Sequence, residues 1–333
     1  MPTNPPTFQS GARVDTRTPE QKANDFQFSE IVASANPVIW IEKTPTMWRK
    51  FPIFNQDGSG SCVAQTQAKE LGILRWLKDG TYVHFSATDI YQRRTNKPGA
   101  GMAAVDARQI ATEGVTLEIL SPSQNMTDSQ MDSAVIEDYK HQVGAVFSVP
   151  NYVEVLAGDV ETIASIIQTT KKGVMVWFYF ELPEWTEKPT ITNTTLGVAS
   201  PSALRHSVTA VDFTLYQGKK ALIIEDSWGT SFGVAGQRII TEEFFKKRNW
   251  YASYLLTFKF ESGGVKPKYD GVTIISLQKC LRYEGFFPSN VDFVENFGPV
   301  TKKALIEFQK KYGIDPQGVL GPITKAKLKQ LFP

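Results

Sequence analysis

One cysteine at the expected start of a helix constrains this chain most strongly. Gly60 and Ser61 precede Cys62 and suit the turn into a helix and its N-cap, and residues 62–78 repeat apolar side chains at helical spacing. The N-terminus of a helix favours a thiolate through its free N–H groups and the positive end of the helix dipole. Gln56 precedes this turn and can donate a side-chain N–H to a developing oxyanion, beside the backbone N–H of Cys62. The stretch therefore predicts a nucleophile together with the groups that activate it.

Only one of the three histidines has a polar partner at a spacing that suggests a catalytic pair. His206 lies in an apolar segment typical of a strand, and a second such segment ends in a polar cluster that contains Asp226. If the two segments pair as antiparallel strands, Asp226 lies beside His206, fixes its tautomer and stabilises its charged form. We interpret His84 and His141 as structural or surface residues. The long separation of Cys62 from His206 predicts two subdomains with the site in the cleft between them.

These motifs, in this order, resemble those of papain-like cysteine peptidases. The family pattern Gln-x5-Cys within Gly-Ser-Cys-x-Ala matches Gln56 and residues 60–64, the pattern His-Ala-Val matches 206–208, and Asn-Ser-Trp-Gly matches 226–229. The likeness extends over about residues 38 to 260. It implies an α+β catalytic domain of two subdomains, a helical left half and a β-barrel-like right half.

The resemblance also implies a reaction and a role for each residue. Cys62 attacks a peptide carbonyl and forms a thioester, and His206 pairs with the thiolate and protonates the leaving amine. Asp226 orients His206, and Gln56 stabilises the oxyanion with the Cys62 N–H. The family needs no cofactor, and the sequence has no Cys/His cluster with metal-ligand spacing.

Three further positions receive a substrate-binding role from the resemblance. Gly101 and Met102 stand where the family has a loop that binds the substrate backbone, and Trp228 stands where a tryptophan shields the histidine's hydrogen bond from water. The chain departs from the family at Asp226, where asparagine is usual. An aspartate keeps the orienting role and adds a charge that raises the pKa of the histidine by stabilising the imidazolium.

Changes in composition divide the chain into four parts. Residues 1–30 show no apolar period and predict a flexible arm, and residues 31–262 form the peptidase domain. Residues 263–269, rich in Gly, Lys and Pro, predict a linker to a helical domain at 270–333. Within the peptidase domain, residues 143–149 predict a strand.

Residues 270–333 resemble the small three-helix peptidoglycan-binding domain of bacterial and phage wall hydrolases. The likeness rests on Leu277, Gln278 and Leu281, on Ala304, Phe308 and Gln309, and on two similar stretches. These are Phe-Gly-Pro-Val-Thr at 297–301 and Leu-Gly-Pro-Ile-Thr at 320–324, each with proline at a first helical turn. From Val265 onward the chain has 11 basic and 6 acidic residues, a balance that favours a wall carrying carboxylates and phosphates.

Composition excludes several other classes of protein. No apolar run approaches the ~20 residues of a membrane span, so we expect no membrane insertion. No base-stacking or phosphate-loop motif is present, and we expect no nucleic-acid partner. Cys62 and Cys280 fall in different predicted domains, which argues against a structural disulfide. Secreted eukaryotic members of the family that the chain resembles usually carry several disulfides, so two cysteines favour a bacterial or phage protein. With no secretory signal visible, we expect it to be cytoplasmic at synthesis and to act at the cell wall after release or as a virion component.

The substrate stays open at this level. We predict a cysteine endopeptidase that acts on peptides or proteins and is directed to the wall by residues 270–333. The alternatives are an endopeptidase that cuts peptidoglycan cross-links, an acyl transferase using the same thioester, and a catalytically inactive wall-binding or virion-structural protein.

Overall fold

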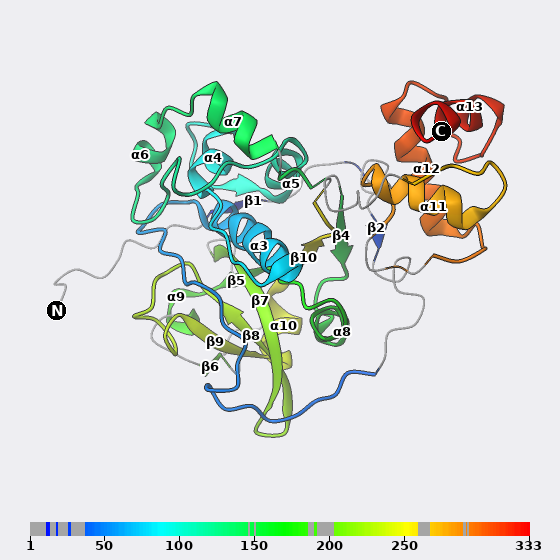
Figure 1. Ribbon diagram of the computed structural model, residues 1–333. Helices are drawn as coiled ribbons and strands as arrows, with labels where there is room; N and C mark the ends of the chain where they lie inside the picture. The colour runs from blue at the N-terminus through cyan, green and yellow to red at the C-terminus, as the bar shows by residue number, and fades with distance from the viewer. Residues whose placement is uncertain are drawn as a thin grey trace.

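The computed structural model describes most of the chain, in eleven stretches: residues 11–13, 18, 26–27, 37–145, 147–149, 151–185, 190–191, 203–258, 267–288, 291 and 293–333. These residues form a larger body with a helical half and a sheet half, and a smaller helical module beside it (Figure 1). The expected α+β architecture with a three-helix C-terminal domain is confirmed.

The helical half is built around one long buried helix, α3 (Cys62–Asp79). The shorter helices around it are α4 (Ala87–Gln92), α5 (Ala104–Glu113), α6 (Asp128–Ser133) and α7 (Asp138–Ala145), with strand β3 (Met102–Ala103) before α5. α3 lies between these helices and the sheet (Figure 1), and Ala64, Ala68 and Leu71 along it are wholly buried. Because both sides of α3 are packed, the position of its first residue is fixed relative to the sheet.

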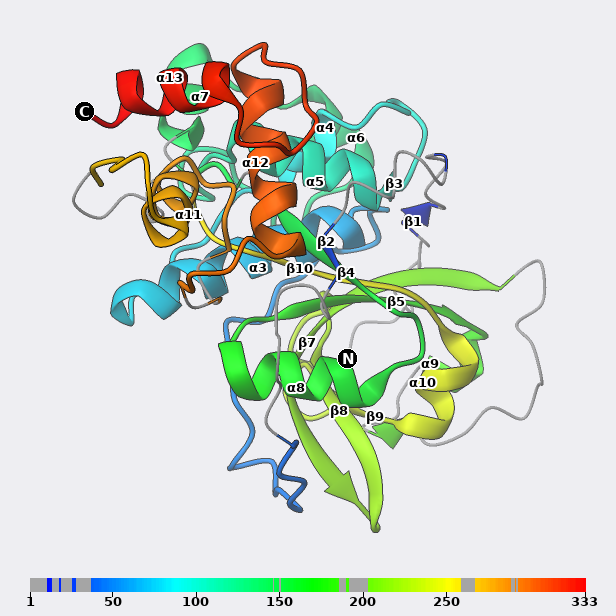
Figure 2. The ribbon, with the colours of Figure 1, turned by 90° about the vertical axis from the view of Figure 1, so that its right-hand side faces the viewer.

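The sheet half is one eight-stranded sheet in the order β2-β4-β10-β5-β7-β8-β9-β6. Its strands are β2 (Phe26–Gln27), β4 (Tyr152–Val155), β5 (Val174–Phe180), β6 (Thr190–Ile191), β7 (Leu204–Tyr216), β8 (Lys219–Glu225), β9 (Gln237–Thr241) and β10 (Asn249–Leu255). Three helices accompany it: α8 (Val160–Thr170), α9 (Leu182–Trp185) and α10 (Glu242–Arg248). Figure 2 shows α8 and α10 on the side of the sheet away from the helical half.

Strand β5 is apolar throughout because both of its faces are buried. Val176 and Phe178 join the cluster formed with α8, whereas Met175 and Trp177 join the cluster of the helical half. Successive side chains of a strand point to opposite faces, so a strand between two packed layers shows no polar alternation.

The pairing of β7 with β8 is antiparallel, as the sequence predicts for the segments of His206 and Asp226. Thr209 is the partner of Glu225, so the start of β7 and the end of β8 lie at the same edge of the sheet. On its other side β7 pairs with β5, where Phe178 is the partner of His206.

The structure corrects the prediction of a strand at 143–149. Residues 143–145 are the last turn of helix α7 instead of the start of a strand. Gly144 lies against the backbone of Val115 and Thr116 so closely that a Cβ there would meet it at 2.8 Å. Within the segment predicted as an arm at 1–30, two short described stretches pair with strands of the body: β1 (Ala12–Arg13) runs beside β3, and β2 runs beside β4.

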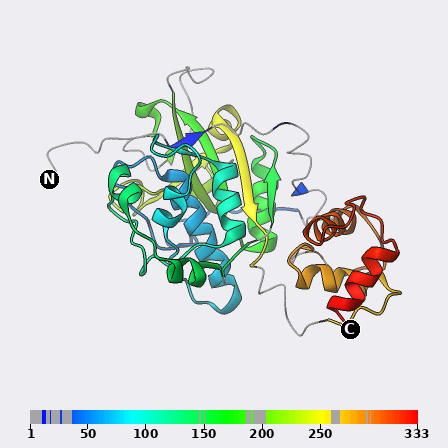
Figure 3. The same ribbon diagram turned by 90° about the horizontal axis from the view of Figure 1, so that it is seen from above.

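The C-terminal module has three helices, α11 (Ile274–Tyr283), α12 (Pro299–Lys311) and α13 (Pro322–Leu331), around a core of its own. The similar stretches at 297–301 and 320–324 also make similar contacts in the structure. Gln278 donates to Thr301 at 2.9 Å and Gln309 donates to Thr324 at 3.0 Å, so each threonine near a helix start is held by the preceding helix. Figure 3 shows the module beside the body, and Asn151 donates to the carbonyl of Gly285 at 2.7 Å between them.

Within the part of the chain that the structure describes, no helix combines the length and apolar character of a membrane span. Both cysteines are free and buried, Cys62 in the larger body and Cys280 in the module.

We predict that the buried ion pair between Lys69 of α3 and Glu225 of β8 stabilises the docking of the two halves. Their atoms lie 2.7 Å apart and both side chains are almost wholly buried. Lys69→Met leaves Glu225 buried without its cation, which costs about 3–5 kcal/mol of unfolding free energy. Lys219→Met, which removes an exposed partner of Glu243, is the control and costs less than about 1 kcal/mol. Urea unfolding followed by tryptophan fluorescence measures both, and equal losses would contradict the prediction.

Candidate active site

Cys62 is the first residue of helix α3 and lies at its positive end. The first turn has no acidic residue, so no carboxylate there competes with a thiolate. Ser61 occupies the N-cap, but its hydroxyl does not cap the helix and instead shares a 2.7 Å hydrogen bond with Ser59. The N–H groups of the first turn are therefore left to act on the sulfur.

His206 and Asp226 meet at the edge formed by β7 and β8. His206 Nε2 and Asp226 Oδ1 share a hydrogen bond of 2.7 Å, and both side chains are buried. The other ring nitrogen, Nδ1, has no hydrogen-bond partner among the described residues. Asp226 therefore holds one side of the ring and leaves Nδ1 available for proton exchange with a thiol.

Charge sets the protonation of this pair. Burial by itself lowers the pKa of His206, but the charge and hydrogen bond of Asp226, with a contribution from Cys62, raise it to about 9. Burial alone would raise the pKa of Asp226, yet the charge and hydrogen bond of His206, followed by Arg238 and Trp185, lower it to about 2. At neutral pH the pair is thus an imidazolium beside a carboxylate.

Gln56 is tied to the residue that follows Asp226. Its backbone N–H donates to the carbonyl of Ser227 at 2.8 Å, and the Ser227 hydroxyl donates to its Oε1 at 2.6 Å. Its Nε2 donates to the carbonyl of Ser59 at 2.6 Å. An amide nitrogen has two hydrogens, so the second can serve an oxyanion.

Trp228 covers the histidine. Its ring centroid lies 5.0 Å from that of His206 at an interplanar angle of 36°, and it is almost wholly buried. Trp185 of α9 meets the same imidazole edge-on at 5.7 Å. The His206–Asp226 hydrogen bond is thus enclosed by two indole rings, which keep it from water.

Gly101 and Met102 contact Gly11 of the N-terminal arm. The N–H of Met102 donates to the carbonyl of Gly11 at 2.6 Å, and a Cβ on Gly101 would lie 2.7 Å from that same oxygen. A Cβ on Gly11 would lie 2.8 Å from the Cys62 sulfur. The two residues predicted to bind a substrate backbone therefore hold the backbone of the arm, directly beside Cys62.

The other two histidines have ordinary neighbours. His84 stacks on Phe54 with ring centroids 5.6 Å apart, and His141 lies 3.6 Å from Asp89. Among the described residues, no group of three or more His, Cys, Asp or Glu side chains is placed to hold a metal ion.

Sequence analysis missed two residues of the site, Trp185 and Arg238. Trp185 lies within a segment, 182–204, whose composition is that of a loop, and Arg238 lies in the short strand β9. Trp185 Nε1 donates to Asp226 Oδ2 at 2.9 Å, and Arg238 Nε lies 3.4 Å from the same oxygen. An arginine within an apolar strand was the one available signal, because such a charge requires a buried partner.

Two family models match the chain. Residues 45–247 match the model of the papain family cysteine proteases, which spans more than half of the sequence. The chain belongs to the papain family of cysteine proteases. Residues 270–328 match a second model, described as "Putative peptidoglycan binding domain". The chain is thus a papain-family cysteine protease with a peptidoglycan-binding domain.

Solved structures share the fold of the papain family. Xylellain, a cysteine protease from Xylella fastidiosa, is 16% identical with a TM-score of 0.60, over 77% of this chain and 99% of that one. Digestive procathepsin L2 from Tenebrio molitor larval midgut is 16% identical with a TM-score of 0.51, over 75% and 84%. The bromelain protease from Ananas comosus, in complex with the E64 inhibitor, is 17% identical with a TM-score of 0.50, over 62% and 94%. No curated protein matches the sequence.

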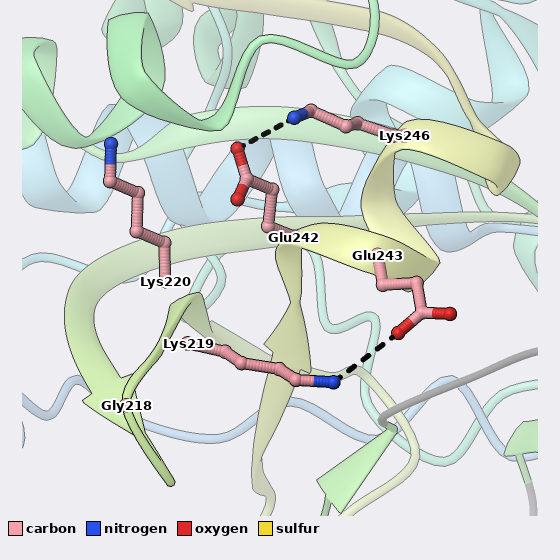
Figure 4. A pocket seen from close by; sticks show the side chains of 6 residues that line it. All are labelled: Gly218, Lys219, Lys220, Glu242, Glu243 and Lys246. Atoms are coloured by element: carbon pink, nitrogen blue, oxygen red, sulfur yellow. Dashed lines mark ion pairs between the residues drawn. The ribbon is translucent and has the colours of Figure 1, made fainter.

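A surface depression at the β7–β8 hairpin offers no comparable chemistry. It is lined by lysines and glutamates of the hairpin and of α10 (Figure 4). Lys246 pairs with Glu242 at 2.8 Å and Lys219 with Glu243 at 3.5 Å, while Lys220 pairs with Glu161. Each of its three lysines is thus paired with a glutamate.

We predict that displacing Gly11 exposes Cys62, whose exposed fraction is 0% in this arrangement. Gly11→Leu has no room for its side chain, because a Cβ would lie 2.0 Å from the Gly60 carbonyl oxygen. Arg13→Ala removes two hydrogen bonds from a guanidinium to the Ala100 carbonyl. Either change should speed alkylation of Cys62 by iodoacetamide about tenfold or more, since a lost charged hydrogen bond is worth ~1.5–3 kcal/mol.

The control for that measurement is Gly321→Leu in the module, where a Cβ would meet no atom within 4 Å. All variants carry Cys280→Ser, so that Cys62 is the cysteine whose alkylation is measured. An alkylation rate for Gly11→Leu equal to that of the control would mean that the arm does not limit access to Cys62.

Proposed function

We propose that this papain-family protease is an endopeptidase that works through Cys62, His206 and Asp226, with Gln56 at the oxyanion. The observation that carries the proposal is the 2.7 Å hydrogen bond between His206 Nε2 and Asp226 Oδ1, which leaves Nδ1 without a partner among the described residues. Cys62 at the start of α3 contributes to the raised pKa of His206, so the two groups interact.

The reaction follows from these positions. In the resting ion pair the Cys62 proton is already held on His206 Nδ1, and the thiolate attacks the carbonyl carbon of the scissile bond. The oxyanion accepts hydrogen bonds from the Cys62 N–H and Gln56 Nε2. The C–N bond breaks as the imidazolium protonates the leaving amine, and a thioester remains. Water, deprotonated by His206, hydrolyses the thioester and restores the thiol.

Asp226 influences both halves of this cycle. A carboxylate stabilises the imidazolium more than a neutral amide does, which favours the thiolate–imidazolium pair. The same stabilisation makes the imidazolium a weaker acid toward the leaving amine. The enzyme therefore gains a persistent ion pair and loses some driving force for leaving-group protonation.

We predict that the alkylation rate of Cys62 against pH shows this ion pair. With the pKa of His206 raised to about 9, the imidazolium persists up to that pH and is lost above it. Cys62 should therefore stay highly reactive at pH values well below ~8.5, the pKa of a free thiol, and its reactivity should change near pH 9. His206→Ala should return Cys62 to ordinary thiol behaviour. Asp226→Asn removes the negative charge and should move the upper transition to lower pH.

The measurement uses iodoacetamide and the Cys280→Ser background. Burial, followed by the charges of Asp270 and Glu284, raises the pKa of Cys280 to about 12, so this substitution removes a thiol that reacts slowly. A wild-type profile identical to that of His206→Ala would exclude the ion pair and leave a protein with an inactive site.

We further propose that residues 270–333 bind peptidoglycan and hold the enzyme at the bacterial cell wall. The match of residues 270–328 to the peptidoglycan-binding model supports this, as does the excess of basic over acidic residues from Val265 onward. The same match favours a second candidate substrate, the cross-linking peptides of the wall, beside proteins embedded in it.

Co-sedimentation with purified bacterial peptidoglycan tests the wall proposal. The Cys62→Ala full chain should sediment with the wall, because binding does not need the thiol, and a chain ending at residue 258 should stay in solution. Binding that survives loss of the module would contradict the proposal. Release of new amines from cross-linked peptidoglycan, compared with release from casein, then tells the two substrates apart.

A further inference from the structure

Asp226 is held on both of its oxygens. Oδ1 is shared with His206 Nε2 and accepts the backbone N–H of Ser227, each at 2.7 Å. Oδ2 accepts Nε1 of Trp185 at 2.9 Å, and Nε of Arg238 lies 3.4 Å from it. The carboxylate has no exposure to solvent. A hydrogen bond to one histidine does not require the partners on Oδ2.

Arg238 lies behind the carboxylate and is itself wholly buried. It is in β9, the strand beside β8, where it pairs with Ile224 and is a diagonal neighbour of Asp226. Its Nη1 donates to the carbonyl of Trp185, and the guanidinium carbon lies 5.5 Å from the centroid of that indole. Trp185 is thus held at its carbonyl by Arg238 and at its ring N–H by Asp226.

These three side chains form a closed group that fixes the carboxylate. Trp185 cannot turn away without losing both contacts, and Arg238 is confined by the rings of Trp228 and Phe232, each 5.7 Å from the guanidinium. A buried guanidinium pairs strongly with a carboxylate, because neither charge has water as an alternative partner.

The charge of this group explains how an aspartate stands where the papain family usually has asparagine. An asparagine amide is neutral, whereas an aspartate brings one negative charge into a buried site. Arg238 brings one positive charge to the same oxygen. Arg238 therefore offsets part of the negative charge that Asp226 brings to the imidazolium.

We propose that Arg238 is a positioning residue for the reaction: with Trp185 it holds Asp226 toward His206 and offsets the aspartate's charge. The proposal rests on the catalytic roles proposed above for Cys62, His206 and Asp226. Without Arg238 the carboxylate binds the imidazolium proton more tightly, and that proton passes less readily to the leaving amine.

Among the described residues, the groups that act on His206 are Asp226 and Cys62 of α3. Other charged side chains on the surrounding elements have neighbours of their own: Arg205 of β7 lies over Tyr179 of β5, Glu184 of α9 pairs with Arg248 of α10 at 2.7 Å, and Glu225 of β8 pairs with Lys69 of α3 at 2.7 Å. Arg238 is the cation that contacts Asp226, so its removal has a predictable sign.

The test is an NMR titration of His206 in the full chain with isotopically labelled histidine. The chain has three histidines, and His206→Gln assigns the signal. Arg238→Met should raise the pKa of His206 by about one unit, the size of effect that one nearby charge has on a buried group. Arg238→Lys, which keeps the charge, should leave that pKa close to the wild-type value.

Arg108→Met is the matched control. Arg108 is equally buried and pairs with Glu70 at 2.6 Å in the helical half, so its loss destabilises the fold without touching Asp226. The pKa of His206 in the Arg108→Met variant should equal the pKa of His206 in the wild-type protein. A pKa of His206 that does not move in Arg238→Met, or moves equally in Arg108→Met, would overturn the role of Arg238.

A second comparison covers the case in which Arg238→Met does not fold. A neutral residue at 226 removes the need for a cation, so Asp226→Asn with Arg238→Met should fold and be at least as stable to heat as Asp226→Asn alone. Folding of Asp226→Asn alone but not of the double variant would overturn the proposal. The catalytic proposal fails separately, if wild-type Cys62 alkylation shows no dependence on His206.

Discussion

The hydrogen bond between His206 and Asp226 depends on the register of two strands. Thr209 of β7 is paired with Glu225 of β8, which brings the start of one strand and the end of the other to one edge of the sheet. A slip of one residue would turn each side chain to the opposite face, and the pair would be lost. The apolar packing on both faces of β5, the other partner of β7, therefore does more than stabilise the fold, because it helps to fix the register that forms the site.

The second requirement is that the helical half meets this edge in one position. Cys62 comes from α3, and α3 is joined to β8 by the buried pair of Lys69 and Glu225, the residue directly before Asp226. Gln56 and Ser227 add two hydrogen bonds across the same junction. These non-covalent contacts between chain neighbours hold together the proposed nucleophile, oxyanion donor and orienting carboxylate. Residues far apart in sequence therefore keep a fixed geometry.

Local patterns made part of this site predictable. Cys62 follows a recognisable helix entry, and Asp226 ends an apolar strand, so each carries a signal in its own neighbourhood. Trp185 and Arg238 carry none that points to Asp226, because their contacts arise only when α9 and β9 pack beside β8. The helix at 143–145 was mistaken for a strand since apolar content alone does not separate the two, and Gly144 serves close packing that sequence does not reveal. The pairing of Gly11 uses backbone atoms, which have no side-chain signature.

The contacts of the arm also indicate what an extended substrate must do. The Met102 N–H and the Ala100 carbonyl are engaged by Gly11 and Arg13, and Gly11 lies against the Cys62 sulfur. A substrate backbone that binds these groups, as the sequence predicts for Gly101 and Met102, competes with a segment of the same chain whose effective concentration is high. A free peptide at low concentration is a weak competitor. Attachment of the module to a polymeric wall would raise the local concentration of wall substrates in the same way. Wall substrates would then compete with the arm for the groups beside Cys62, whereas dilute substrates away from the wall would not displace it.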